Sequence, residues 1–581
     1  MRYLLAVICL ILLGLMPMTA QDDDADGRGL IVAVNWRGTE GIGSLNPLRC
    51  DNFECGHILD LLFPTLIGID HETGTFTRDI SERNALVTDW TVSEDGLVYT
   101  FTLRDDAFWS DGQPITAYDV FFSHQVIASE QIGSPFESRF DDRLIGMVPL
   151  DTFTIAALYS ESGCDAIDYT NFPIAPAHAF DTDFADIAAD FFNTIEPLNN
   201  QYAAWEEQNY DFRYMIEHPF NRFPSATSGS FQVIDVQPND YIRLVSNDGR
   251  LAFDYIDPIN GYTSAEMFIN GDTNLLTRPA FVRRNDLDAV SNVQIATSPF
   301  NFWDFMGFNL ADPTNPQSAF DEDGNPLEQG HHPIFADIRV RQAIQLAIDV
   351  QALLDAAVRG YGVAMPSSHI SSSWAYDESL SVPQFDPVAA AALLHEAGWR
   401  DINGDGIREC ADCMYAETGQ PLSFSLMVDT NVTRRQIAAT MIPQQLAHVG
   451  IRAQVEDINY NRLQQQTFDA YLTSWGEDYP VNPDQTDLFT RAADVLDEGW
   501  NVGSYHNTEL DDLMEQARTL PGCDYDERAE LYHQIQAILQ RDQPFVWLYV
   551  PQEITYAAGN IDGFNPRGGA LFWNIQNWII R

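Results

Sequence analysis

The sequence predicts an α/β protein built from several folded lobes. Its 581 residues are too many for one hydrophobic core, because domains average roughly 150 residues. Apolar residues make up 45% and aromatic residues 12% of the chain, which is enough for sizeable cores. Strand-like alternation and helix-like spacing of apolar residues follow one another along the sequence. These observations favour packed sheets and helices over a disordered chain.

The clearest local pattern is a strand hairpin followed by a helix. Large apolar residues occupy alternate positions of 97–103, and the turn at 93–96 joins this stretch to a first strand at 87–92. Thr116 and Asp119 can cap a helix that runs through 120–124. Sheet and helix therefore alternate here.

Further helices are expected where apolar residues share one face. They cover 337–348, 349–358, 386–398, 510–517 and 529–539, and a buried strand is expected at 545–549. The stretches 184–225 and 311–333 are poorly periodic and are expected to be long loops or lobe connections.

The charge balance excludes several function classes. The formal net charge is −54, which disfavours nucleic acid and anionic membrane surfaces as partners and favours a cationic or zwitterionic solute. Solubility in a salty or acidic habitat explains the same acidity equally well. The sequence contains no lysine, so a pyridoxal phosphate Schiff base, a P-loop and a kinase site are all excluded.

The first 20 residues resemble an export signal. Arg2 precedes the apolar run Leu4–Met16, and Ala20 offers a cleavage point before an acidic run. An uncleaved membrane anchor stays open as the alternative.

Cysteine spacing favours disulfides in an exported protein. Six cysteines remain after Cys9 of the signal segment is removed from the seven in the chain. The pairs Cys50/Cys55 and Cys410/Cys413 can each close a small loop, which leaves Cys164 for Cys523. Other connectivities stay open. A zinc site is disfavoured because no second half completes Cys410-x-x-Cys413.

Several segments carry a family resemblance. The motif residues are Asp89-Trp90, Ser93–Leu97, Asp111-Gly112, Thr116–Val120, Asp337–Ala343, Gly360–Gly362, Phe385–Pro387, Ala397–Trp399 and Trp475–Pro480. In this order they resemble the family 5 extracellular solute-binding proteins, the dipeptide, oligopeptide and nickel receptors of ABC importers. The chain departs from the usual glycine-rich turn of that family at 226–231.

The resemblance implies a two-lobed, periplasmic-binding-protein-like (type II) fold with mixed sheets, a two-segment hinge and an extra subdomain in the first lobe. After the signal peptide at 1–20, lobe 1 would comprise 21–300 together with 505–581, and lobe 2 would comprise 301–504. The solute would be enclosed between the lobes.

The same resemblance implies an extracytoplasmic receptor, in the periplasm or on the outer face of the cytoplasmic membrane. It would be a monomer without catalytic activity or a required cofactor, and it would pass an oligopeptide or a similar small solute to an ABC importer permease. Family peptide receptors place an aspartate against the peptide ammonium, and Asp478 holds that motif position. Trp475 and Tyr479 would form one aromatic wall, and Trp303 and Phe305 would line the opposite side.

A separate motif at 401–412 predicts a structural calcium ion. Its expected ligands are Asp401, Asn403, Asp405, the carbonyl of Ile407 and Asp412. A surface turn rich in Asx residues explains the same pattern without an ion.

Two other functions stay open. A nickel, haem or oligosaccharide receptor on the same fold is the first alternative, although the histidines form no clear ligand set. A secreted metal-dependent hydrolase is the second, and it lacks both a nucleophile elbow and an H-E-x-x-H pair.

Overall fold

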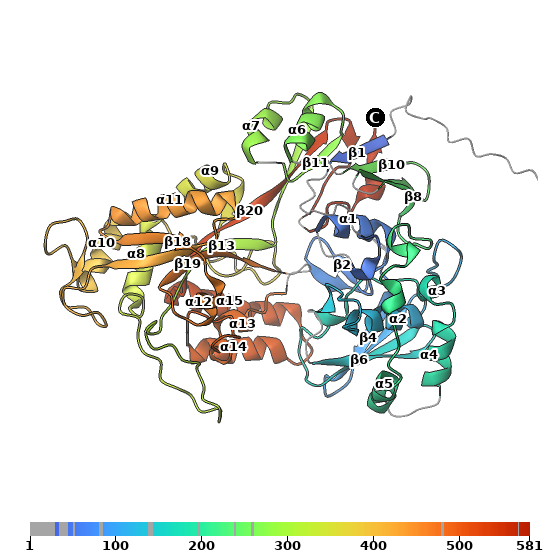
Figure 1. Ribbon diagram of the computed structural model, residues 1–581, viewed down its shortest axis with the longest axis horizontal. Coiled ribbons are helices and arrows are strands. Elements are labelled where there is room, and N and C mark those ends of the chain that lie inside the picture. The colour runs from blue at the N-terminus through green and yellow to red at the C-terminus, as the bar shows by residue number, and fades with distance from the viewer. Residues whose placement is uncertain are drawn as a thin grey trace, which may run out of the picture.

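The computed structural model describes residues 29–33, 44–49, 53–80, 85–137, 143–193, 198–237, 240–256, 261–279, 281–477, 482–567 and 569–581. The predicted signal segment at 1–20 lies outside these residues. Two lobes stand side by side and are linked at one end by the long strand β20 (Phe545–Ala558) (Figure 1).

A single twelve-stranded sheet runs through both lobes. Ten of its strands follow the order β18-β17-β19-β13-β20-β11-β1-β10-β9-β8, and β12 and β14 also pair with β20. The first half of β20 pairs with β13 (Phe302–Phe308) and β14 (Gly362–Ala364) in the second lobe. Its second half pairs with β11 (Leu275–Thr277) and β12 (Val293–Pro299) in the first lobe.

Two chain segments therefore cross between the lobes. One is β20 itself, and the other is the short connection from β12 to β13. The Phe300 amide of this connection donates to the Pro551 carbonyl of β20 at 3.0 Å, so the two crossings lie side by side. They form the two-segment hinge that the sequence resemblance implies.

The first lobe holds one extensive hydrophobic core. The helices and strands of this lobe include β1 (Gly29–Ala33), α1 (Phe53–Leu62), β2 (Gly68–Asp70), β3 (Thr75–Thr77), β4 (Val87–Val92), β5 (Val98–Leu103), α2 (Ala117–Ala128), β6 (Leu144–Asp151), β7 (Thr154–Tyr159), α3 (Ala177–Phe180), α4 (Phe184–Phe192), α5 (Leu198–Glu206), β8 (Phe231–Gln237), β9 (Tyr241–Ser246), β10 (Ala252–Ile256), α6 (Gly261–Asn270), β11, α7 (Arg284–Asp288) and β12. A separate four-stranded sheet, β4-β5-β7-β6, packs against α2, α4 and α5. This sheet and its helices form the extra subdomain.

Local chemistry explains the elements that the sequence predicts correctly. The β4–β5 hairpin closes as expected through the turn at Ser93 and Gly96, where Gly96 has a φ of 74°. Thr116 and Asp119 form a reciprocal capping box at the start of α2. Asp337, Asp349 and Asp386 cap three of the second-lobe helices that the sequence predicts.

The second lobe is built around two hydrophobic clusters. Its elements are β13, α8 (Ile338–Ala347), α9 (Val350–Ala357), β14, α10 (Pro387–Glu396), β15 (Trp399–Arg400), β16 (Glu409–Cys410), β17 (Ser423–Val428), α11 (Thr433–Ala447), β18 (Arg452–Asp457), α12 (Tyr460–Gln464), β19 (Ala470–Gly476), α13 (Thr486–Phe489), α14 (Thr508–Thr519), α15 (Tyr525–Asp542) and the first half of β20. The stretch 311–333 carries no named helix or strand, as predicted.

The C-terminal part of the chain divides between the two cores. Leu510 and Met514 of α14, and Tyr532 and Ile535 of α15, share a cluster with Trp303 of β13. From residue 557 onward, buried residues join the first-lobe core. The lobe boundaries expected from the sequence stay a prediction, but this packing argues for placing 505–550 with the second lobe.

The prediction that 184–225 is a long loop is wrong. Helices α4 and α5 form there, and Phe184, Ala188 and Phe192 are buried on one face of α4. The two helices are short, with nine residues each, so a search for long periodic patterns misses them. Trp205 at the end of α5 packs among the aromatic rings of α4 and α2.

Two of the predicted disulfides are present among the described residues. Cys164 pairs with Cys523, and Cys410 pairs with Cys413. Cys55 is also disulfide-bonded, while its predicted partner Cys50 lies outside the described residues.

Gly229 provides a direct test of the first-lobe packing. Its amide donates to the carbonyl of Leu62, and a Cβ at this position would overlap the backbone carbonyl of Leu61. Gly229→Ala should therefore cost about 1–3 kcal/mol of stability and lower the melting temperature in calorimetry. Gly56→Ala in α1 is the control, because nothing lies within 4 Å of its added Cβ. Equal melting temperatures for Gly229→Ala and the wild type would contradict this packing.

Candidate functional site

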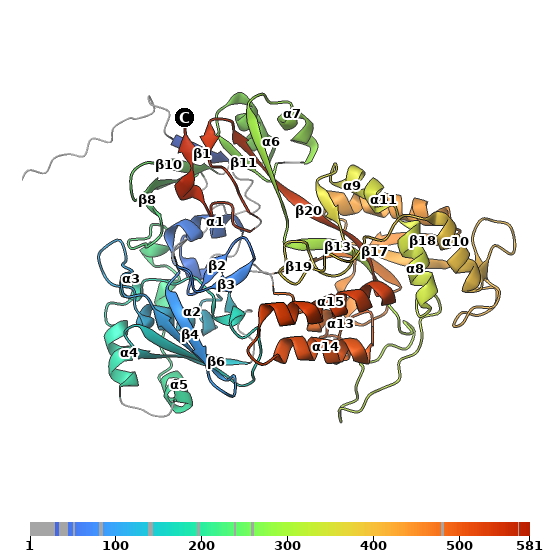
Figure 2. The ribbon, with the colours of Figure 1, turned by 180° about the vertical axis from the view of Figure 1, so that it is seen from behind.

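A cavity of about 810 Å³ lies between the two lobes. The first lobe contributes residues 71–75 and 565–567, and the second lobe contributes 371–374 together with Tyr525, Asp526 and Ala529 of α15. The end of β12 lines it through residues 297–299, and the connection from β12 to β13 lines it through Asn301. Figure 2 shows the start of α15 facing the β2–β3 hairpin across the gap between the lobes.

A tight turn fixes the first-lobe wall of the cavity. The Asp70 carboxylate accepts hydrogen bonds from the amides of Glu72 and Thr73 at 2.8 and 3.3 Å. The Gly74 amide donates to the Asp70 carbonyl, and Gly74 has a φ of 70°, which favours glycine. The turn therefore presents the Glu72 and Thr73 side chains to the cavity.

Trp374 is the fixed aromatic side chain of the opposite wall. Its ring meets the ring of Tyr525 edge-on, with centroids 4.8 Å apart, and the ring of Tyr532 at 5.7 Å. The Arg528 guanidinium lies 5.1 Å from the Trp374 ring centroid. Burial raises the pKa of the Tyr525 hydroxyl, so this group stays protonated at neutral pH. These contacts hold Trp374 in place without filling the cavity.

The cavity lining carries both signs of charge. Glu72 and Asp526 are acidic, and Arg567 is the arginine among the described lining residues. Arg567 Nη2 lies 3.7 Å from Glu72 Oε1, and both side chains are partly exposed, so their pairing contributes little to stability. A solute that carries an ammonium and a carboxylate can therefore find a counter-charge for each group here.

The first three residues of the motif at 475–480 reach the edge of this cavity. Strand β19 pairs with β13 so that Trp475 lies opposite Trp303 and Gly476 opposite Phe302. The Glu477 amide donates to the Asn301 carbonyl at 2.6 Å, and the Asn301 side chain donates to the Glu477 carbonyl at 2.5 Å. Because Asn301 lines the cavity, the chain stands at the cavity edge at Glu477. Asp478 and Tyr479 follow directly and lie outside the described residues.

The aromatic residues predicted to contact solute occupy two different environments. Trp475 is half-buried and meets the Trp500 ring at 6.0 Å. Trp303 is 0% and Phe305 2% exposed, inside the second-lobe core. Trp303 Nε1 donates to Glu477 Oε1 at 3.2 Å. The structure therefore places Trp303 behind the cavity wall, and solute contact by Trp303 or Phe305 stays a prediction.

Reasoning from the sequence missed most of the cavity lining. Trp374, Tyr525 and Arg567 come from three distant segments, and none belongs to a motif with a recognisable chemical pattern. The serine run at 371–373 before Trp374 is the one local signal for a polar surface loop.

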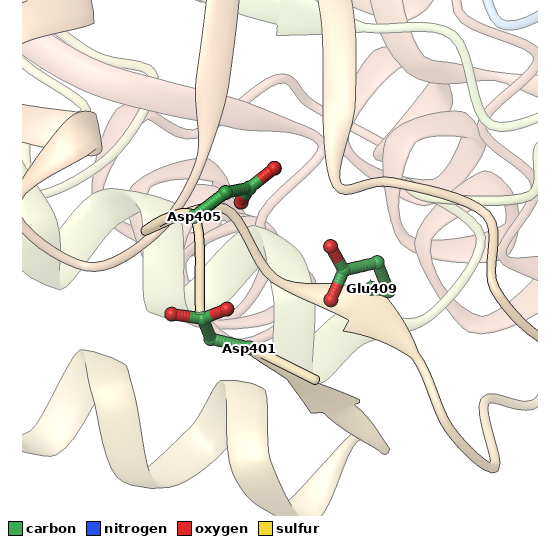
Figure 3. A group of neighbouring side chains, drawn as sticks. All are labelled: Asp401, Asp405 and Glu409. Atoms are coloured by element: carbon green, nitrogen blue, oxygen red, sulfur yellow. The ribbon is translucent and has the colours of Figure 1, made fainter. Parts of the chain in front are cut away.

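A second group of acidic side chains lies on the predicted calcium loop. Asp401, Asp405 and Glu409 each offer a carboxylate oxygen, and these oxygens lie within 4.8 Å of one another (Figure 3). Gly404 and Gly406 adopt φ values of 77° and 88°, which lets the loop turn sharply.

One of the predicted calcium ligands differs in the structure. Asp412 lies outside the acidic group because its carboxylate pairs with Arg400 at 2.7 Å. Buried Glu409 is in the group instead, and it accepts from the Ile402 amide and from the Asn403 side chain. The Asn403 side-chain oxygen Oδ1 accepts from the Asp405 amide. The predicted role of the Ile407 carbonyl as a calcium ligand stays a prediction.

Histidine is scarce among the described residues that line the cavity. His71 is the histidine among its described lining residues and packs against the ring of Trp573 at 5.8 Å. His57 is buried, and its burial lowers its pKa to about 3, so the imidazole is neutral at physiological pH.

Within the described ranges, no helix combines the length and apolar character required to cross a bilayer.

The sequence of this chain is similar to those of known proteins. The family model described as bacterial extracellular solute-binding proteins, family 5 Middle, matches residues 83–496. The oligopeptide-binding protein AppA of Bacillus subtilis (strain 168) is 24% identical over 511 residues, which cover 84% of this chain and 81% of that protein.

Two solved structures show the same fold. AppA from Bacillus subtilis in complex with a nonapeptide matches with a TM-score of 0.61 at 22% identity, covering 95% of this chain and 99% of that one. NikZ from Campylobacter jejuni in complex with Ni(L-His) matches with a TM-score of 0.62 at 20% identity, with coverages of 95% and 99%. They confirm the predicted two-lobed type II fold. From the family match over most of its length, the chain belongs to family 5 of the bacterial extracellular solute-binding proteins.

Proposed function

We propose that this protein is the extracytoplasmic receptor of an ABC importer and binds an oligopeptide or a similar small zwitterionic solute between its lobes. The observation that carries the proposal is the interlobe cavity. Its lining includes two acidic residues, Glu72 and Asp526, and one basic residue, Arg567. Closure of the lobes would remove the ends of a peptide from water, so both ends need a counter-charge. The receptor would then present the solute to a membrane permease.

The cavity chemistry favours a peptide over the alternatives. A bare nickel ion needs several nitrogen or carboxylate ligands converging on one point, and among the described lining residues the cavity has one histidine. The acidic group at 401–409 does not line the cavity, which argues against a hydrolase that uses it on a bound solute. Mass spectrometry of the solute that copurifies with the protein separates peptide, metal complex, haem and oligosaccharide.

The proposal includes export and a monomeric receptor. Residues 1–20 would direct secretion and be removed, which leaves the receptor in the periplasm or at the outer face of the membrane. The formal charge of −54 keeps such molecules apart in solution.

Asp478 tests recognition of the peptide ammonium. Asp478→Asn should weaken binding of a short peptide by a few kcal/mol, or tens-fold to hundreds-fold in Kd, because a desolvated ammonium loses its counter-charge. An N-acetylated peptide should bind the wild type and the variant equally weakly in calorimetric titration. Glu498→Gln is the control, because Glu498 is exposed and does not line the cavity. An unchanged Kd for the free peptide would remove Asp478 from the site.

Arg567 tests recognition of the opposite end of the peptide. Arg567→Gln should weaken binding of a peptide with a free carboxyl terminus about tenfold or more, because a charge-assisted hydrogen bond is lost. The same peptide with an amidated terminus should bind both proteins alike. An equal loss for both peptides would assign Arg567 a structural role in the wall instead.

We also propose that Asp401, Asp405 and Glu409 hold a structural Ca²⁺ ion. Three carboxylate oxygens on a loop that turns at two glycines suit a hard cation. Millimolar Ca²⁺ should raise the melting temperature, since a ligand at 100 times its Kd contributes about 2.7 kcal/mol. Glu409→Gln should abolish this shift, and Asp412→Asn should preserve it. A shift that depends on Asp412 and not on Glu409 would restore the ligand set predicted from the sequence.

A further inference from the structure

The two lobes are joined a second time, by a disulfide away from the hinge. Cys164 lies in the first lobe in the loop after β7, and Cys523 lies in the second lobe between α14 and α15. Their Cα atoms are 5.2 Å apart although 359 positions separate them in the sequence. We propose that this bond is a covalent clasp that limits how far the lobes open and so makes solute exchange sensitive to thiol reductants. The regulatory part rests on the proposed solute-binding function.

Each cysteine is anchored in its own lobe. Next to Cys164, Asp165 is buried and pairs with Arg143 at 2.5 Å, and Ala166 belongs to the first-lobe core. Next to Cys523, Asp524 caps α15 by accepting from the amides of Asp526 and Glu527. Movement of either lobe is therefore transmitted to its cysteine.

The clasp and the hinge lie on opposite sides of the solute cavity. Pro299 and Asn301 line the cavity at the hinge, and Tyr525 and Asp526 line it two and three positions after Cys523. The Cys164 amide also donates to the Arg518 carbonyl of α14 at 2.7 Å. A swing about the hinge strands would separate Cys164 from Cys523. An intact disulfide prevents this, because it tolerates Cα separations only up to about 7 Å.

A reductant can reach the bond from solvent. Cys523 is partly exposed, and its neighbours Pro521, Gly522 and Asp524 are exposed. A second cavity, of about 640 Å³, is lined by both cysteines and by the β4–β5 turn at 93–96. This cavity gives a thiolate an approach to the sulfur of Cys523, whereas Cys164 is 4% exposed.

The chemical step is thiol–disulfide exchange with a dithiol reductant. A reductant thiolate attacks Cys523 Sγ, forms a mixed disulfide and releases the Cys164 thiolate, which takes up a proton. The second reductant thiol then displaces Cys523 as a thiol. Two electrons and two protons pass to the protein, and the reductant leaves as its own disulfide. The lobes are then joined by the hinge strands and by non-covalent contacts.

The test compares three proteins: the wild type with and without dithiothreitol, Cys164→Ser/Cys523→Ser, and Cys410→Ser/Cys413→Ser. The last pair closes a loop within one lobe, so it controls for cysteine removal and reduction elsewhere. Small-angle X-ray scattering of solute-free protein measures lobe opening without relying on peptide binding. Stopped-flow fluorescence with a short labelled peptide measures association and dissociation rates. Circular dichroism checks that each variant is folded, and reduced wild type replaces the clasp variant if that variant misfolds.

We expect a larger radius of gyration and at least tenfold faster peptide exchange when the clasp is removed or reduced, and oxidised wild-type behaviour from the 410/413 variant without reductant. Unchanged scattering would overturn the clasp, and so would equal changes in the 410/413 variant. Expansion with unchanged exchange rates would overturn its regulatory role. Expansion in a protein that binds no peptide in any form would support the clasp and reject the proposed peptide function.

Discussion

Strand β20 hydrogen-bonds to both lobes within one fourteen-residue run. Its first half pairs with β13, and its second half pairs with β11 and β12. Because backbone pairing leaves little freedom within a strand, relative motion of the lobes has to concentrate at the two crossings. The cavity lies beside these crossings, so a change in lobe angle there changes access to it. The position of the solute site follows from this constraint.

The charges in the cavity suit a zwitterionic solute. Glu72, Asp526 and Arg567 line the walls and provide counter-charges for a zwitterion. Trp374 supplies an aromatic face that is locked by Tyr525 and Tyr532, and such a face accepts varied side chains without requiring one hydrogen-bond pattern. The walls belong to different lobes, so full contact with the solute requires both lobes together.

The disulfide between Cys164 and Cys523 joins the two lobes at a second place, away from the hinge. A two-lobed receptor with a free edge can open widely, whereas a molecule joined at both edges of its cavity exchanges solute through a narrower motion. The same α15 that carries the cavity residues Tyr525 and Asp526 begins two positions after Cys523. The cavity wall and the second-lobe end of the clasp are thus neighbours in the chain.

Local chemistry made much of the fold predictable. Capping residues such as Thr116, Asp337 and Asp386 mark where helices begin, and the Ser93–Gly96 turn predicts the β4–β5 hairpin. The sequence did not predict helices α4 and α5, because they are short and their burial depends on aromatic contacts between distant residues. The same limit applies to the site: the sequence indicates Asp478 and Trp475 through a motif, but Trp374 and Arg567 come to line one cavity only through tertiary structure.

The central claim is that one solute contacts both lobes across this cavity. Hydrogen–deuterium exchange with and without a saturating short peptide measures it directly, because bound solute and lobe closure slow the exchange of nearby amides. The account predicts simultaneous protection of residues 71–75 in the first lobe and 371–374 and 525–529 in the second. Protection confined to one lobe, or centred on the loop at 401–409, would contradict it.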